Sequence, residues 1–113
     1  AKKEQEGIAL LRRAAEADKG EAGAQARLEM GRLLYARGAA ARQMYAQAYD
    51  ELMKIIYLHA EQKAIVVEAL YLAADSLARQ GNKNGALGLL DRLLREFPDG
   101  EWAIKARALK ESL

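Results

Sequence analysis

The sequence contains no cysteine and no threonine, and only one proline, one histidine and one tryptophan among its 113 residues. Without cysteine the chain can form no disulfide, no thiolate metal site and no cysteine nucleophile. Its net charge is only +2, and basic residues are interleaved with acidic ones, as where Glu16 and Asp18 follow Arg12 and Arg13. A nucleic-acid-binding protein usually gathers Lys and Arg on one face. We therefore expect no nucleic-acid partner.

The patterns of catalytic and metal-binding sites are also missing. His59 has no cysteine and no second histidine with which to complete a metal site, so we expect it to be a structural or surface residue. Ser76 and Ser112 are the only serines, and neither lies in a nucleophile elbow. The segment GNKNG at residues 81–85 lacks the Gly-Lys-Ser/Thr ending of a phosphate-binding loop. We expect no enzymatic activity, no cofactor and no metal.

Long apolar runs and targeting segments are absent as well. No apolar run approaches the ~20 residues of a membrane-spanning helix, and no signal peptide is visible. The chain begins with Ala1 rather than Met, so we expect it to be part of a longer protein whose upstream portion has been removed. The lack of cysteine is compatible with both the cytosol and an oxidising envelope.

The residues that are present favour helices, because Ala, Leu, Arg, Glu and Lys dominate the composition. The predicted fold class is all-α, with six helices at residues 3–17, 21–37, 40–59, 63–79, from Asn82 or Asn84 to Phe97, and 101–112. Gly38 is expected to stop the second helix and Gly81 the fourth. Apolar residues nearly encircle the 40–59 segment, which we expect to be the longest and most buried helix.

The clearest motif lies in residues 67–98, VEALYLAADSLARQGNKNGALGLLDRLLREFP. If Val67 is position 1, positions 8, 11, 15, 20, 24 and 32 are occupied by Ala74, Leu77, Gly81, Ala86, Leu90 and Pro98. This segment resembles one unit of the tetratricopeptide repeat, whose period is about 34 residues. The resemblance implies a right-handed superhelix of antiparallel helix pairs, each made of a helix A and a helix B. It also implies a non-enzymatic scaffold that binds a protein or peptide, as an adaptor or assembly factor.

The rest of the chain resembles the same repeat less closely. We expect a single domain over residues 1–113, divided into a half-repeat helix B (1–19), a stretched repeat (20–60), a full repeat (61–98) and a half-repeat or capping helix (99–113). In the stretched repeat, Gly31, Gly38, Ala48, Leu52 and Ile55 match Ala74, Gly81, Ala86, Leu90 and Leu93 of the full repeat. The stretch lies between Gly38 and Ala48. Position 4 is Leu70 in the full repeat but Arg27 in the stretched one.

The resemblance also implies where a partner would bind, because the A helices of this family line a concave groove. The groove positions correspond to Gln25, Leu28, Arg32 and Tyr35 in one unit and to Glu68, Tyr71, Asp75 and Arg79 in the next. Tyrosine and arginine are common interface anchors. The alternative is that these residues only cover a solvated wall.

A second hypothesis is self-association into a homodimer, because both ends resemble half-repeats whose neighbours are missing. Trp102, Ala106, Leu109 and Leu113 share one face of the last helix, which we expect to pack on the fifth helix with its tryptophan partly shielded. Ile104 would then be exposed, and Trp102 and Ile104 are the candidate self-association residues. The alternative is a rotated helix with Ile104 in the core and Trp102 exposed.

The segment REFPDGEW, at residues 95–102, resembles repeats of bacterial envelope proteins of the Tol-Pal coordinator and outer-membrane assembly lipoprotein type. This resemblance favours the periplasm or cell envelope as the compartment, with the cytoplasm as the alternative.

Overall fold

The computed structural model describes residues 2–113, and Ala1, the first residue of the expected domain, lies outside the described residues. Helices occupy 81% of the chain, and residues 2–113 include no strand. The six helices are α1 (Lys2–Ala17), α2 (Glu21–Arg37), α3 (Met44–Leu58), α4 (Lys63–Arg79), α5 (Lys83–Glu96) and α6 (Glu101–Ser112). The predicted all-α class is confirmed, and α2, α4 and α6 have the predicted bounds.

The third helix is shorter than predicted, because residues 38–43 form turns instead of helix. Gly38 ends α2, as predicted, but its backbone is right-handed (φ −58°), so a left-handed conformation is not the reason for a glycine here. A Cβ atom at this position would lie 2.3 Å from Cε1 of Tyr45. The absence of a side chain at Gly38 therefore allows the Tyr45 ring to lie close to the end of α2. The loop at residues 38–43 accounts for the extra residues between Gly38 and Ala48.

The prediction that this helix is the longest and most buried is also wrong. α3 has 15 residues, whereas α2 and α4 have 17 each. The most buried helix is α4, in which ten residues are buried, compared with seven in α3. α4 lies in the middle of the stack, where helices from both neighbouring pairs cover it.

The turn between α4 and α5 follows its sequence signals closely. Gly81 is left-handed (φ +87°), and the Asn82 amide donates back to the Leu77 carbonyl at 2.9 Å, which is the Schellman ending of a helix. The Asn82 side chain then accepts from the Gly85 amide at 2.9 Å. Of the two predicted caps, Asn82 rather than Asn84 therefore begins α5.

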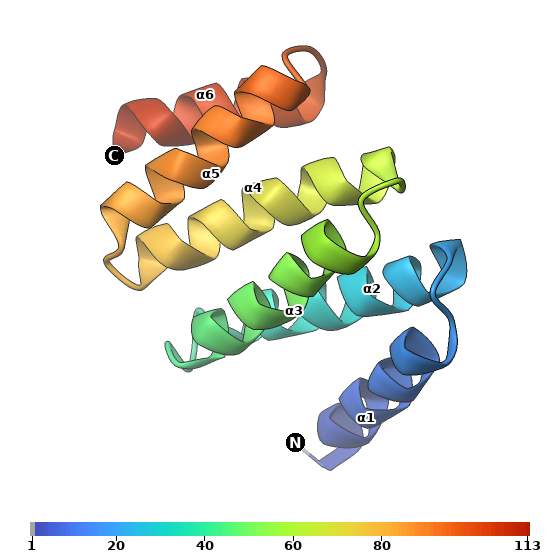
Figure 1. Ribbon diagram of the computed structural model, residues 1–113. Coiled ribbons are helices and arrows are strands. Elements are labelled where there is room, and N and C mark those ends of the chain that lie inside the picture. The colour runs from blue at the N-terminus through green and yellow to red at the C-terminus, as the bar shows by residue number, and fades with distance from the viewer. Residues whose placement is uncertain (1) are drawn as a thin grey trace.

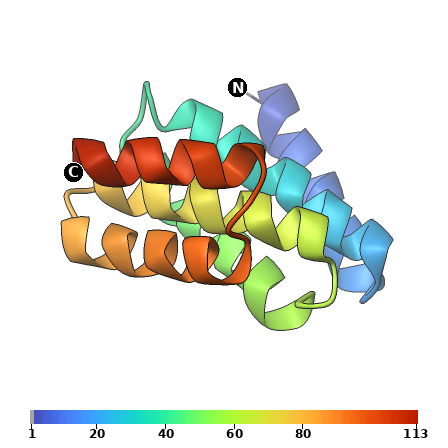
Figure 2. The same ribbon diagram turned by 90° about the horizontal axis from the view of Figure 1, so that it is seen from above.

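The helices stack in chain order, so that the two termini lie at opposite ends (Figure 1). Each helix packs on the next one in the chain. In addition, α4 contacts both α2 and α6. Within residues 2–113, α1, α3 and α5 do not contact one another. Figure 2 shows α4, α5 and α6 running side by side. The molecule measures 37 × 32 × 19 Å, and its shortest dimension is that of two helix layers. The helices of the α2–α4–α6 layer lie closer to one another than those of the α1–α3–α5 layer do. We therefore call α2, α4 and α6 the inner helices and α1, α3 and α5 the outer helices.

Small residues occur where helices of the two layers meet. Ala48, Ala74 and Ala86 have no exposed surface. At Gly31 an added Cβ atom would lie 2.6 Å from Cδ2 of Leu52, which is itself fully buried. The core is completed by the largest fully buried apolar side chains, namely Leu28, Met30, Leu52, Ile55, Leu70, Leu90 and Leu93.

Candidate binding surface on helices α2, α4 and α6

The inner helices bring most of the predicted groove residues together. Six of them are joined by two residues of α6, and we call this set the α2–α4–α6 face: Arg32, Tyr35, Glu68, Tyr71, Asp75, Arg79, Trp102 and Lys105. Three sets of contacts hold the face together.

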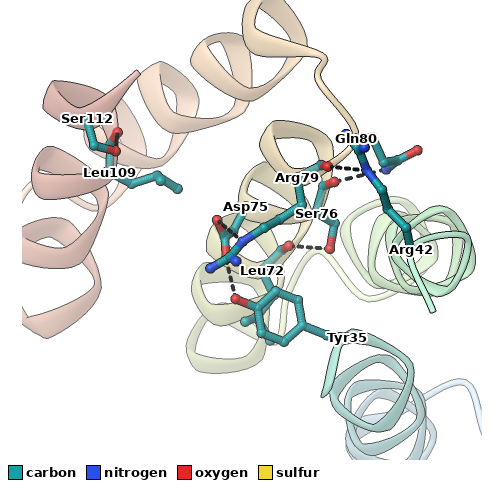
Figure 3. A network of polar contacts seen from close by, with 9 residues as sticks. All are labelled: Tyr35, Arg42, Leu72, Asp75, Ser76, Arg79, Gln80, Leu109 and Ser112. Atoms are coloured by element: carbon teal, nitrogen blue, oxygen red, sulfur yellow. Dashed lines mark hydrogen bonds and ion pairs between the residues drawn. The ribbon is translucent and has the colours of Figure 1, made fainter. Parts of the chain in front are cut away.

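The first contact joins α2 to α4 through a buried carboxylate (Figure 3). The Tyr35 hydroxyl donates to Asp75, whose exposed fraction is only 5%, and Nε of Arg79 lies 3.5 Å from the other carboxylate oxygen. Burial and the hydrogen bond to Asp75 raise the pKa of Tyr35 well above its usual value. The phenol therefore stays protonated as a donor, while the nearby carboxylate raises the pKa of Arg79.

The second contact is a two-pronged ion pair between the same helices. Nε of Arg32 donates to Oε2 of Glu68, and Nη2 of Arg32 donates to Oε1, both at 2.6 Å. A third bond, 2.9 Å long, joins Nη1 of Arg32 to Glu29 one turn earlier in α2. The hydrogen bond to Glu68 raises the pKa of Arg32. Because an arginine fork matches a carboxylate in shape, this pair fixes the orientation of both side chains.

The third contact is an aromatic pair that joins α4 to α6. The ring centroids of Tyr71 and Trp102 are 5.5 Å apart, with 43° between the ring planes. Both side chains are half-buried, and burial raises the pKa of Tyr71. Nζ of Lys105 lies 4.4 Å from the centroid of the Trp102 ring, close enough for a cation–π contact. A partly exposed aromatic platform therefore borders an exposed cation.

One end of the α2–α4–α6 face has an open surface pocket of about 380 Å³, which we call the Arg42–Arg79 pocket. The loop at residues 38–43 lines it with Arg42 and small residues at 38–40, α3 contributes Tyr45, and α4 contributes Arg79. Nε of Arg42 donates to the Arg79 carbonyl at 3.0 Å. The pocket is lined by two guanidinium groups and by no acidic side chain.

Two of the predicted groove residues do not belong to this face. Leu28 is only 2% exposed and lies in the hydrophobic core, so its assignment to an open groove was wrong. The repeat register predicted its position along α2, but the packing of the core covers its side chain. Gln25 is exposed near the start of α2, apart from the contacts described above.

Sequence reasoning missed Arg42, Tyr45 and Lys105. The stretch between Gly38 and Ala48 was a signal for the first two, because inserted residues must emerge at one end of the helix pair. Nothing in the local pattern singled out Lys105.

The two candidate self-association residues have different surroundings. Ile104 is 67% exposed on α6, as predicted, and the rotated alternative is excluded. Trp102 is partly shielded, also as predicted, but its ring contact comes from Tyr71 of α4 rather than from α5. Ile104 therefore remains available for contact with another molecule, whereas one side of the Trp102 ring is already covered.

Other kinds of site find little support within residues 2–113. No three or more His, Asp or Glu side chains gather there in a way that could hold a metal ion. None of the described helices is both long and apolar enough to cross a membrane. No family model, no curated protein and no solved structure matches the chain.

Proposed function

We propose that this protein is a non-enzymatic module of the tetratricopeptide-repeat type that binds a segment of another protein on the α2–α4–α6 face. The observation that carries the proposal is the arrangement of Tyr35, Tyr71 and Trp102, three half-buried aromatic residues on three successive inner helices, beside the exposed Arg79 and Lys105. Tyrosine, tryptophan and arginine are the residues most enriched among those that dominate binding energy.

The contacts within the face favour binding because they order the side chains in advance. Tyr35 is held by Asp75 and Arg32 by Glu68. A side chain that becomes immobile only on binding costs about 0.5–1.5 kcal/mol. Side chains that are already fixed by hydrogen bonds avoid most of this cost, so a short segment can bind without a large buried area.

The chemistry of the face indicates the kind of segment that fits. An aromatic or aliphatic side chain would pack on the Tyr71–Trp102 pair, because both aromatic side chains are only half-buried. An acidic group would lie in the Arg42–Arg79 pocket, whose lining includes two guanidinium groups and no acidic side chain, although Arg79 also pairs with the nearby Asp75. The proposed partner is therefore an extended segment with an apolar residue and an acidic residue.

The experiment selects binding peptides from a displayed random library and measures their affinity through the fluorescence of Trp102, the only tryptophan in the chain. Tyr71→Ala combined with Arg79→Ala should weaken binding about tenfold or more, with unchanged circular dichroism. The matched control is Tyr57→Ala combined with Arg95→Ala, which removes an exposed tyrosine and an exposed arginine from the outer helices. Loss of binding in the control, with retention in the first variant, would refute the proposal.

Self-association is a second candidate, which the exposed Ile104 favours. If this residue mediates a homodimer, Ile104→Glu should abolish a concentration-dependent increase in mass in sedimentation experiments without loss of helicity. A chain that stays monomeric at all concentrations would eliminate this candidate.

A further inference from the structure

Three buried polar residues lie close together outside the α2–α4–α6 face. Arg27 is 6% exposed, Glu51 is 4% exposed and His59 is 2% exposed. Nη1 of Arg27 lies 3.2 Å from Glu51. We call Arg27, Glu51 and His59 the buried polar cluster.

The second helix pair, α4–α5, has apolar residues at the three positions that correspond to this cluster. Arg27 corresponds to Leu70, Glu51 to Leu89 and His59 to Phe97, in the alignment that pairs Gly31 with Ala74 and Leu52 with Leu90. The structure supports this alignment at the end of each B helix. His59 follows α3 and donates its amide to the Ile55 carbonyl at 2.8 Å, just as Phe97 follows α5 and donates to the Leu93 carbonyl at 2.7 Å.

The buried polar cluster therefore stands where the second helix pair has one core residue, Leu70, and two partly buried apolar residues, Leu89 and Phe97, that pack against the core. Exchanging a buried ion pair for apolar residues of similar size is often neutral or stabilising. Stability alone does not account for these residues, and departures from good packing are expected where a sequence serves a function.

Two atoms of the cluster have unused hydrogen-bonding capacity. Nε of Arg27 and Nδ1 of His59 are buried and have no hydrogen-bond partner among residues 2–113. A buried donor without a partner costs about 1–3 kcal/mol. Because arginine is always protonated, its Nε–H group requires an acceptor, whereas Nδ1 of His59 can serve in either role.

Both residues line a cavity of about 300 Å³, at the lower end of the size of small-molecule sites. The cavity lies between the end of α1, the start of α2 and the end of α3, and Ala15 and Leu58 give it apolar walls. The rim consists of exposed side chains, among them Lys19 and Leu58. Nε of Arg27 and Nδ1 of His59 have almost no accessible surface, so a ligand in the cavity reaches them only when the side chains that cover them rotate, which exposed side chains do on the nanosecond scale.

Four basic side chains (Arg12, Lys19, Arg27 and Lys54) and three acidic ones (Glu16, Asp18 and Glu51) line the cavity or surround the Arg27–Glu51 pair, which gives a net charge of +1. The carboxylate of Glu51 lies 3.2 Å from Arg27, 3.2 Å from Lys54 and 3.5 Å from Arg12, so three positive charges surround one negative charge. Lys19 adds a positive charge at the rim, and Glu16 and Asp18 add negative ones. The Asp18 carboxylate accepts from the Gly20 amide at 2.6 Å, so it is partly neutralised by hydrogen bonding.

We infer that this cavity is a binding site for a small apolar carboxylate. One carboxylate oxygen accepts a hydrogen bond from the Nε–H group of Arg27 and the other accepts one from the Nδ1–H group of His59, while the aliphatic body packs on Ala15 and Leu58. Either a free short-chain acid or the C-terminus of a peptide that ends in an aliphatic residue has this chemistry. The site does not depend on the proposed function, because none of its residues belongs to the α2–α4–α6 face.

The test is a titration of the ¹⁵N-labelled protein, followed by NMR, with 4-methylpentanoate and with a short peptide ending in leucine. Saturable shifts at the amides of residues 15–19 and 58–59 are expected with 4-methylpentanoate or with the peptide. A response to the peptide alone would assign the site to a chain terminus, and a response to the free acid alone would assign it to a metabolite. No saturable shift with either probe would overturn the inference, and so would equal binding of the neutral isostere 4-methylpentanamide.

Variants separate ligand binding from a structural role. The triple variant Arg27→Leu, Glu51→Leu and His59→Phe copies the second helix pair, so it should fold with an unchanged or higher melting temperature and lose binding. The milder Arg27→Lys retains a cation beside Glu51 but lacks the Nε–H donor, and it should weaken binding about ten- to a hundredfold, the effect of one charged hydrogen bond. Binding at full strength in Arg27→Lys would overturn the inference even if the triple variant failed to fold.

Discussion

Gly31 offers a sharp test of how closely the two helix layers are packed. It lies inside α2, and an added Cβ atom would lie 2.6 Å from Cδ2 and 2.9 Å from Cγ of Leu52. Leu52 is fully buried, so it cannot move aside without displacing its neighbours. Such overpacking costs typically ~1–3 kcal/mol, whereas the change from glycine to alanine in a helix gains about 1 kcal/mol. Gly31→Ala should therefore lower the free energy of unfolding by up to about 2 kcal/mol.

Gly88 provides the matched control, because it also lies inside a helix but is exposed, and no atom would lie within 4 Å of an added Cβ. Gly88→Ala should show only the gain in helix propensity, about 1 kcal/mol. The two variants should thus differ by about 1–3 kcal/mol, or very roughly 4–12 °C in melting temperature for a domain of this size.

Denaturant unfolding followed by circular dichroism measures both variants. A double-mutant cycle with Leu52→Ala then locates the cause, because removing the Leu52 side chain should abolish the penalty of Gly31→Ala. If Gly31→Ala proved as stable as Gly88→Ala, or if its penalty persisted with Leu52→Ala, the packing argument would be refuted.

Two further predictions concern a helix cap and the tyrosines. Asn82→Ala should lower the free energy of unfolding by about 1 kcal/mol, because the Gly85 amide loses its acceptor, whereas Asn84→Ala, also exposed, should show no loss in the same denaturation experiment. The raised pKa values of Tyr35 and Tyr71 mean that the folded state holds these protons at a pH where the unfolded state has lost them. Stability should therefore be fully present below about pH 10 and fall as the pH rises above it. Tyr35→Phe should flatten that fall in a series of alkaline melting curves, and an equally steep fall would contradict the assignment.

The sequence alone predicted the helices well wherever a residue restricts the backbone by itself. Gly81 requires a left-handed backbone, Asn82 offers an acceptor to free amides, and Pro98 cannot continue a helix. Each of these effects acts over a few residues, so the end of α4 and both ends of α5 could be predicted without knowledge of the fold. The exposure of Ile104 was predictable for a similar reason, since its position on the helix follows from the helical period.

The beginning of α3 could not be predicted in this way. Residues 39–41 are alanines, the best helix formers, yet they form a turn. The Tyr45 ring packs against Gly38 at the end of α2, and this contact outweighs the small local preference for helix. Leu28 was misplaced for a related reason, because the helices that cover it come from elsewhere in the chain.

The polar contacts depended most on the tertiary structure. The pairs Arg27–Glu51, Arg32–Glu68 and Tyr35–Asp75 are separated by 24, 36 and 40 residues, and each joins two different helices. Helical periodicity identifies which side of a helix a residue occupies, but it does not fix the rotation and spacing of neighbouring helices to within the length of a hydrogen bond. The sequence by itself therefore determined the helices, most of their ends and the small residues at their crossings. Only the packing of complete helices decided which side chains meet, because that depends on the shapes of all the side chains between them.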